Sequence, residues 1–322
     1  MKKSMIAAAV AASMVAPAAM ADTTLGGQLQ AELVNATGDG VVEGLYMTDG
    51  WEGKVVNKGN ASAFFVKGAH DLGNGLKGLY KLNFNPKFGD NFSSVGTRDA
   101  YIGLSGGFGT VLFGRLSTPY KSSTVKWDPF LGTFMQARAS NGMSALHNGY
   151  VGNVLAYVNK FGPAKVAVGV ALDEAPNGAE TYGNHATTAS VNVPVGPVEL
   201  ALGYIDVSEM GGGADNASAV KVGVKYGSGP MSVAVQYEQL DDGIGDADVI
   251  YGVGTFKAGS NTFALAYGVT QPDTGSDKTY AALGVKHAFS KSVVLHAGVT
   301  KNETDGGNDD ATLVGAGLRV KF

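Results

Sequence analysis

Beyond its first two dozen residues, the sequence divides into segments of about ten residues in which apolar side chains occupy alternate positions. In the last segment, Leu318, Val320 and Phe322 alternate with Arg319 and Lys321. Because successive side chains of a strand point to opposite faces, each segment is predicted to be a strand with one apolar and one polar face. No run after the amino-terminal region reaches the roughly 18 apolar residues of a spanning helix, so any membrane-spanning part is expected to use strands.

The pattern predicts sixteen strands, at 24-34, 61-72, 75-85, 98-106, 109-116, 149-160, 164-172, 185-195, 197-206, 217-227, 230-239, 247-258, 260-270, 279-289, 292-302 and 310-322. Seven connections between them are tight and carry Gly, Pro or Ser, whereas the others are long and polar. This alternation is typical of an outer-membrane barrel with short periplasmic turns and long extracellular loops. A soluble β-sandwich needs no such sorting of turn lengths. We therefore predict an all-β fold, a 16-stranded antiparallel transmembrane β-barrel.

The amino-terminal residues have the pattern of a secretory signal peptide. Lys2 and Lys3 precede an apolar stretch over 6-20, and Ala19-Met20-Ala21 is a small-x-small cleavage signature. We therefore expect a signal peptide over 1-21 and a barrel domain over 22-322. The chain has no cysteine, so no disulfide framework is expected. Its formal net charge of −4 argues against a nucleic-acid partner.

Two stretches of sequence resemble one known family. Residues 100-115 read AYIGLSGGFGTVLFGR and continue with LSTPY to Tyr120, while 71-77 read DLGNGLK. These stretches are similar to a strand, turn and strand and to the first periplasmic turn of the Gram-negative general porins. The resemblance implies a homotrimer in the outer membrane, in contact with lipid and lipopolysaccharide. It also implies a water-filled channel for passive diffusion of small hydrophilic solutes and ions, narrowed by an inward-folded third extracellular loop.

Two departures from the family pattern concern charge. His70-Asp71 stands where relatives have an acidic pair, and Ala63 stands where an Arg is common, so ion selectivity does not transfer directly. The carboxyl-terminal stripe of Leu318, Val320 and Phe322 resembles the signal that the outer-membrane assembly machinery reads.

The connection over 117-148 is much longer than its neighbours, and long connections are often functional. By resemblance it is the constriction loop, and Asp128 is its only carboxylate. Three of the four arginines of the chain, Arg98, Arg115 and Arg138, bracket this loop. Because Arg stays charged and holds a planar fork, it suits a fixed field across a narrow aqueous gap.

We predict that Arg98 and Arg138 face the narrowest part of the pore, opposite Asp128. The parity of Arg115 directs it outward unless its strand ends earlier, which leaves a role in holding a loop or a subunit contact. Three further cations have the parity of the lumen and extend the basic wall: Lys67, Lys81 and Arg319. One acid against several cations predicts a weak anion preference, whereas the acidic outer loops would enrich cations at the mouth.

Other functions have less support in the sequence. None of the five histidines stands in a metal-ligand or nucleophile motif, so no enzyme activity, metal or cofactor is expected. Two alternatives stay open. A substrate-selective channel requires an aromatic track for sugars or a dense basic ladder for phosphate, and a structural or adhesive barrel requires a plugged lumen.

Overall fold

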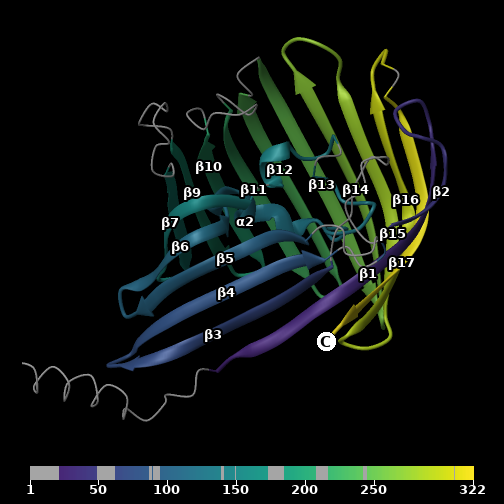
Figure 1. Ribbon diagram of the computed structural model, residues 1–322. Helices are drawn as coiled ribbons and strands as arrows, with labels where there is room; N and C mark the ends of the chain where they lie inside the picture. Colours follow the sequence, from purple (N-terminus) through teal and green to yellow (C-terminus); the bar gives the residue numbers. More distant parts are fainter. Residues whose placement is uncertain are drawn as a thin grey trace, which may run out of the picture.

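The computed structural model describes residues 22–48, 62–86, 89, 95–138, 141–148, 150–172, 185–207, 217–241, 245–307 and 309–322. The expected signal peptide over 1–21 lies outside the described residues. Strands dominate, and the described helices are short (Figure 1). Among the described residues, no helix is long and apolar enough to cross a membrane.

The strands form one antiparallel sheet that closes on itself. In chain order the elements are β1 (Thr24–Thr37), β2 (Gly44–Thr48), β3 (Ala63–Gly73), β4 (Leu76–Pro86), β5 (Val95–Gly106), β6 (Gly109–Ser117), α2 (Pro119–Thr124), β7 (Tyr150–Phe161), β8 (Ala164–Leu172), β9 (His185–Val195), β10 (Val198–Asp206), β11 (Ser218–Ser228), β12 (Met231–Asp241), β13 (Asp246–Ala258), β14 (Asn261–Pro272), β15 (Lys278–Ala288), β16 (Val293–Thr304) and β17 (Ala311–Lys321). Two single 3₁₀ turns, Val125–Trp127 and Ala145–His147, complete the set.

The seventeen strand segments make a barrel of sixteen strands. Both β2 and β3 pair with β1, β2 along Glu32–Ala36 and β3 along Thr24–Gln28, so together they fill the place of one strand. The prediction of sixteen strands is confirmed. The predicted second strand, 61-72, corresponds to β3, and β2 is an additional short segment within the connection predicted before it. Closure comes from β1 and β17, and the terminal Phe322 exchanges backbone hydrogen bonds with Gly27 in both directions at 3.0 Å.

The tight turns all lie at the end of the barrel that carries the carboxyl terminus, and the long connections lie at the other end (Figure 1). The seven expected turn positions all connect consecutive strands. Four of these turns place a glycine in the left-handed region, with φ between 56° and 59°, where a side chain would be strained: Gly162, Gly196, Gly229 and Gly259.

The two faces of the wall differ as the alternation predicts. On β14 the outward Leu265 and Tyr267 are 61% and 55% exposed, whereas the inward Ala264 and Ala266 are 4% and 1% exposed. An apolar exterior faces lipid at no cost in desolvation, and a closed barrel leaves no strand edge unpaired in the membrane.

Candidate pore constriction

The connection between β6 and β7, which we call loop 3 (118–149), folds into the barrel and not outward. Its helix α2 lies within the ring of strands in Figure 1, in contact with β9 and β10. Thr118 caps α2, because its hydroxyl accepts a hydrogen bond from the backbone N–H of Lys121 at 3.1 Å. Loop 3 thus begins with a defined turn toward the opposite wall.

An apolar cluster fixes loop 3 to the inner face of the far wall. Trp127, Phe130, Phe134, Met135 and Met143 of the loop are at most 7% exposed. They pack against small inward residues of the wall, among them Ala201, Ala234, Ala264, Ala266 and Ala282. The small residues are necessary for this approach. A Cβ added at Gly223 would lie 2.6 Å from the Trp127 ring, and one at Gly284 would lie 2.8 Å from the Phe130 ring.

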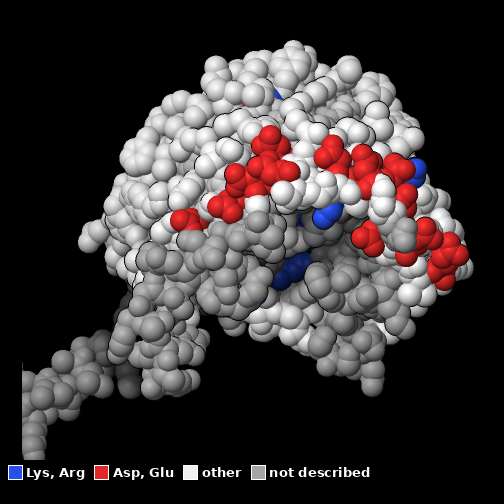
Figure 2. All heavy atoms as spheres, turned by 90° about the horizontal axis from the view of Figure 1, so that it is seen from above, with Lys and Arg blue, Asp and Glu red and all other residues white. Residues whose placement is uncertain are grey.

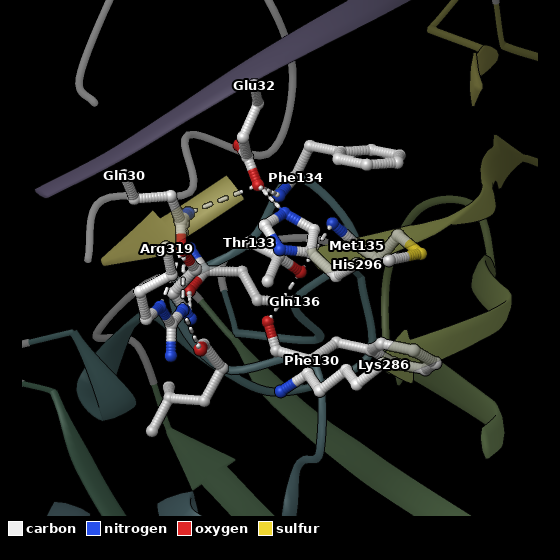
Figure 3. A network of polar contacts seen from close by, with 12 residues as sticks. Gln30, Glu32, Phe130, Thr133, Phe134, Met135, Gln136, Lys286, His296 and Arg319 are labelled. Atoms are coloured by element: carbon white, nitrogen blue, oxygen red, sulfur yellow. Dashed lines mark hydrogen bonds and ion pairs between the residues drawn. The ribbon is translucent and has the colours of Figure 1, made fainter. Parts of the chain in front are cut away.

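A first polar anchor joins loop 3 to β1, β16 and β17 (Figure 3). Glu32 accepts hydrogen bonds from the backbone N–H of Phe134 at 3.1 Å and contacts His296 Nε2 at 2.6 Å. Gln30 donates to the carbonyl of Gly132 at 2.5 Å, and its Oε1 accepts from Arg319 Nε at 2.7 Å. Since these groups are mostly buried, each bond offsets a desolvation cost that would otherwise destabilise the loop.

A second anchor lies on β11 and β12. The buried carboxylate of Glu238 accepts hydrogen bonds from the hydroxyls of Tyr120 and Ser144. Lys221, which is 1% exposed, lies directly opposite Glu238 in the strand register and donates to His147 Nε2 at 2.8 Å. Burial, reinforced by the charge of Lys221, holds the pKa of His147 well below its usual range, so its ring accepts this bond as the neutral form.

On its other side, loop 3 leaves a cavity of about 570 Å³ against the wall formed by β4 to β8. Among the described residues, this cavity is lined by seven cationic side chains and one carboxylate: Lys81, Arg98, Lys121, Lys126, Arg138, Lys165, Arg319 and Asp99. The cavity lies in the lumen, between loop 3 and the inner face of these strands. We therefore treat it as the candidate constriction.

An irregularity in β5 brings two adjacent charged residues into this cavity. The pairing of β4 with β5 shifts between Leu82 and Phe84, which leaves Arg98 and Asp99 without a regular partner on β4. A bulge of this kind re-aims side chains, so both residues line the cavity although they are neighbours in sequence. Asp99 contacts Lys81 Nζ at 2.5 Å and accepts from the backbone N–H of Ser117 at 3.2 Å.

Lys121 is the most unusual cation of the site. It is 4% exposed, its ammonium lies 3.7 Å from the centre of the Tyr150 ring, and it donates to the carbonyl of Asn148 at 3.2 Å. Burial, together with the nearby charge of Arg138, lowers the pKa of Lys121 to about 7. Its charge therefore changes near neutral pH.

Four of the seven pore residues chosen from the sequence line the cavity: Arg98, Arg138, Lys81 and Arg319. Lys67 lies opposite Lys81 in the register of β3 and β4, but it is not among the residues that line the cavity. Arg115 is also absent from the lining, and its Nε donates to the carbonyl of Thr97 at 3.2 Å. This contact agrees with the alternative that Arg115 holds a neighbouring segment.

Asp128 does not have the place that was predicted for it. It is 3% exposed, and its two oxygens accept hydrogen bonds from the backbone N–H of Phe130 and Ala137 at 2.8 and 2.9 Å. Burial raises the pKa of Asp128, and these two hydrogen bonds oppose that rise. The carboxylate therefore closes a turn within loop 3 on the side of the far wall, and the acidic member of the cavity is Asp99.

Sequence reasoning also missed Asp99, Lys121, Lys126 and Lys165 as cavity residues. For Lys165 a signal was available, because it lies in β8 with the parity of the inward Ala167. For Asp99 a signal was available too, because it has the parity of the inward Tyr101, opposite to the exposed Ile102 and Leu104. The residue that enters the lumen against the alternation is Arg98, beside the bulge. Lys121 and Lys126 belong to loop 3, where periodicity carries no information.

The outer mouth has the opposite charge. Seen from above, carboxylates gather along part of the rim around a hollow in which Lys and Arg side chains are visible (Figure 2). The exposed carboxylates in or beside the long connections include Asp39, Glu43, Asp241, Asp246, Asp273, Asp305 and Asp309.

Comparison with known proteins gives a consistent result. The family model described as Gram-negative porin matches residues 7–307. The outer membrane porin protein 32 of Delftia acidovorans is 27% identical over 336 aligned residues, which cover 98% of this chain and 92% of that protein. The major outer membrane protein P.IB of Neisseria gonorrhoeae is 37% identical over 127 residues, so the match spans 38% of this chain and only 34% of that relative.

Solved structures show the same fold. The anion-selective porin from Comamonas acidovorans has a TM-score of 0.78 at 21% identity, and the match covers 94% of this chain and all of that one. A trimer form of OmpT from Vibrio cholerae has a TM-score of 0.68 at 17% identity, with 94% and 99% of the two chains covered.

Proposed function

The chain belongs to the Gram-negative porin family and forms a water-filled channel for small hydrophilic solutes across the outer membrane, and we propose that this channel passes anions in preference to cations. The observation that carries the proposal is the charge of the cavity beside loop 3. Its described lining has seven cationic side chains and one carboxylate, Asp99, which is itself in contact with Lys81.

The position of these charges gives them a large effect. A narrow aqueous gap between protein walls focuses the electric field of its lining, so cations there raise the local concentration of anions. Arg98 and Arg138 keep their charge across the physiological pH range because of the high intrinsic pKa of the guanidinium group. The part of the field that these two residues supply is therefore independent of pH in this range.

The acidic rim favours cations, but it is the weaker influence. Its carboxylates are exposed to bulk solvent, where the Debye length is about 8 Å at physiological ionic strength. Salt therefore screens the rim more than it screens the partly buried cations of the constriction. We expect the anion preference to increase relative to the effect of the rim as the salt concentration rises.

One solved structure supports the same direction of selectivity. The solved structure from Comamonas acidovorans is described as an anion-selective porin, and its fold matches nearly all of this chain. The structural likeness alone conveys the fold, so the proposal depends on the cations of this chain.

The test is a reversal-potential measurement on the refolded protein in a planar bilayer under a salt gradient. In an anion-selective pore, the reversal potential has the sign of the equilibrium potential of the anion, at both low and high salt. A potential of the opposite sign at high salt, where the rim is screened, would contradict the proposal. A correctly folded barrel that conducts no current would instead favour a structural or adhesive role.

We also propose that the protein acts as a homotrimer in contact with lipid and lipopolysaccharide, after removal of residues 1–21. The trimer form of the OmpT structure supports this assembly. Conductance steps in groups of three, and cross-linked trimers in detergent, would test it.

The carboxyl-terminal stripe is proposed as the signal for the assembly machinery. Leu318, Val320 and Phe322 are 43%, 39% and 66% exposed on the last strand. Deletion of Phe322 is expected to reduce the amount of folded barrel in the outer membrane of cells. The same variant should still refold in detergent, since the other β1–β17 pairs remain. Equal membrane levels of variant and parent would contradict this role.

A further inference from the structure

One wall of the constriction cavity is apolar, although it faces the lumen. Leu112 and Leu116 on β6, Ala156 and Val158 on β7, and Ala167 on β8 all line the cavity. The strand register makes them neighbours, because Leu112 lies opposite Ala156 and Val158 lies opposite Ala167. They therefore form one continuous patch, which we call the apolar wall.

Such a patch is unusual for the inside of a pore. The lumen face of a porin strand normally carries polar side chains that water solvates. Elsewhere on the inner face of this barrel, the small apolar residues of β10 to β16 are covered by loop 3, as the buried cluster around Phe130 and Met135 shows. The apolar wall differs because it lines the open cavity, where Leu112 and Val158 are half-buried. Leu116, Ala156 and Ala167 are at most 7% exposed, and Leu116 and Ala156 belong to a second buried cluster.

Cations lie directly beside the apolar wall. Tyr150 belongs to β7, the strand of Ala156 and Val158, and the ammonium of Lys121 lies 3.7 Å from the centre of its ring. Arg98 and Arg138 line the same cavity. Loop 3 adds Val125 and Leu131 to the lining. A solute in the cavity therefore meets positive charge and apolar surface at the same time.

From this juxtaposition we infer that the constriction prefers small organic acids with an apolar body, such as short branched carboxylates, to equally small acids whose body is hydroxylated. The inference rests on the proposed anion preference and makes it more specific. The carboxylate of the solute contacts the cations, and its alkyl group lies against Leu112, Val158 and their neighbours. The charged end of the solute then meets groups of opposite charge, and its apolar end meets apolar surface.

Physical chemistry favours this pairing over either feature alone. A hydroxylated acid would lose hydrogen bonds to water when its body approaches the apolar wall, and the wall offers no replacement. An alkyl body loses no such bonds, and its contact with the wall removes apolar surface from water. An inorganic anion gains from the cations but gains nothing from the wall.

Isobutyrate and lactate provide a matched pair of probes. Both are small monoanions at neutral pH, and lactate carries a hydroxyl where isobutyrate carries a methyl group. Single-channel conductance of the refolded full-length mature protein is measured against the concentration of each sodium salt. We expect isobutyrate to half-saturate the conductance at a concentration about two- to fourfold lower than lactate, because a fully buried methyl group contributes at most about fourfold.

Isosteric variants test the wall itself. Val158→Thr combined with Leu112→Asn makes the wall polar at nearly constant volume, and we expect the isobutyrate to lactate ratio to fall to about one. Val166→Thr is the matched control. It makes the same chemical change on the neighbouring β8, with the parity of the exposed Val168 and thus on the outer face, so the ratio should stay at its original value. If the double variant does not fold, Val158→Thr alone tests the wall, and we expect it to lower the ratio part of the way.

The outcomes separate this inference from the proposed function. Equal half-saturation by the two acids in a channel that still prefers chloride to sodium would overturn the inference and leave the anion preference in place. A ratio that persists in the polar-wall variants would also overturn it, since the wall would not be the contact. A channel that prefers sodium to chloride would contradict the proposed function itself.

Discussion

Both sides of loop 3 carry charged side chains, but on one side they are buried and paired, and on the other they line a cavity and are mostly of one sign. Toward the far wall, the charged groups Glu32, Glu238 and Lys221 are at most 2% exposed, and each has a partner that belongs to another segment of the chain. Toward the cavity, the cations outnumber the carboxylates seven to one among the described lining residues. We refer to these as the packed side and the open side.

The difference separates position from selectivity. A buried charge needs a partner, so the packed side holds loop 3 in the arrangement that gives Glu32, Glu238 and Lys221 their partners. Water and solutes solvate the open side, so an excess of one sign is tolerated there. We therefore expect substitutions on the packed side to change stability, and substitutions on the open side to change ion preference.

The largest effect is expected from Glu238→Ala on the packed side. The substitution leaves Lys221 buried opposite a methyl group and removes the acceptor of Tyr120 and Ser144, which should cost about 3–5 kcal/mol of the free energy of unfolding. The measurement is denaturant unfolding in lipid vesicles, followed by the fluorescence of Trp127 in a Trp51→Phe background, since the chain has only these two tryptophans.

The control for this prediction removes both charges. Lys221→Met combined with Glu238→Gln keeps an acceptor for the two hydroxyls and leaves no unpaired charge, so most of the stability should return. Loss of stability equal to that of Glu238→Ala would show that the charge pair is not the cause.

A smaller loss of stability is expected from Asp128→Ala. Two backbone N–H groups, of Phe130 and Ala137, lose their acceptor in a buried turn, which should cost about 1–3 kcal/mol. The reversal potential should not change, because Asp128 does not line the cavity. A shift of the reversal potential toward anions would restore the role in the constriction that the sequence suggested.

On the open side, Arg138→Gln should alter ion preference. Removal of one guanidinium charge from the cavity lining is expected to reduce the anion to cation permeability ratio roughly two- to fivefold. Reversal potentials measure this ratio, and Lys67→Gln is the matched control, since it removes a cation that is not part of the lining. If both variants reduce the ratio equally, the charge of the whole lumen matters and not that of the constriction.

The smallest effect concerns pH. Because burial and the charge of Arg138 lower the pKa of Lys121 to about 7, this side chain is charged below that pH and neutral above it. The other charged groups that face it are Arg98, Arg115 and Asp99. We expect the anion preference to decrease about twofold between pH 6 and pH 8.

Lys121→Met removes the titrating group and should flatten the pH profile at the value that the parent reaches at high pH. A profile that keeps its slope in this variant would assign the titration to another residue of the cavity.

The local pattern was sufficient for the wall. Alternation along β14 places Leu265 and Tyr267 outside and Ala264 and Ala266 inside, and the structure confirms this arrangement. The same alternation also indicated where loop 3 packs on the wall, because only small residues on the inner face leave room for Phe130 and Met135. That signal was visible in the sequence but was not interpreted as a docking surface.

The pattern failed where the backbone leaves its regular period. The bulge between Leu82 and Phe84 in the β4–β5 register brings both Arg98 and Asp99 into the lumen, which no strictly alternating strand can do. The short β2 was missed as well, since residues 44–48 fall in a stretch that was predicted to be a connection. Asp128 was misplaced because the direction of a side chain in a loop has no period.

The sequence by itself therefore determined the barrel, its sixteen strands, its turns and its lipid-facing surface, because each depends on residues that are neighbours along the chain. Only the tertiary structure decided which charges meet at the constriction and which are paired behind loop 3. Glu238 and Tyr120 are 118 residues apart, and Glu32 and Phe134 are 102 apart. Pairing over such separations follows from closure of the barrel and from the fit of loop 3 inside it, which no local pattern encodes.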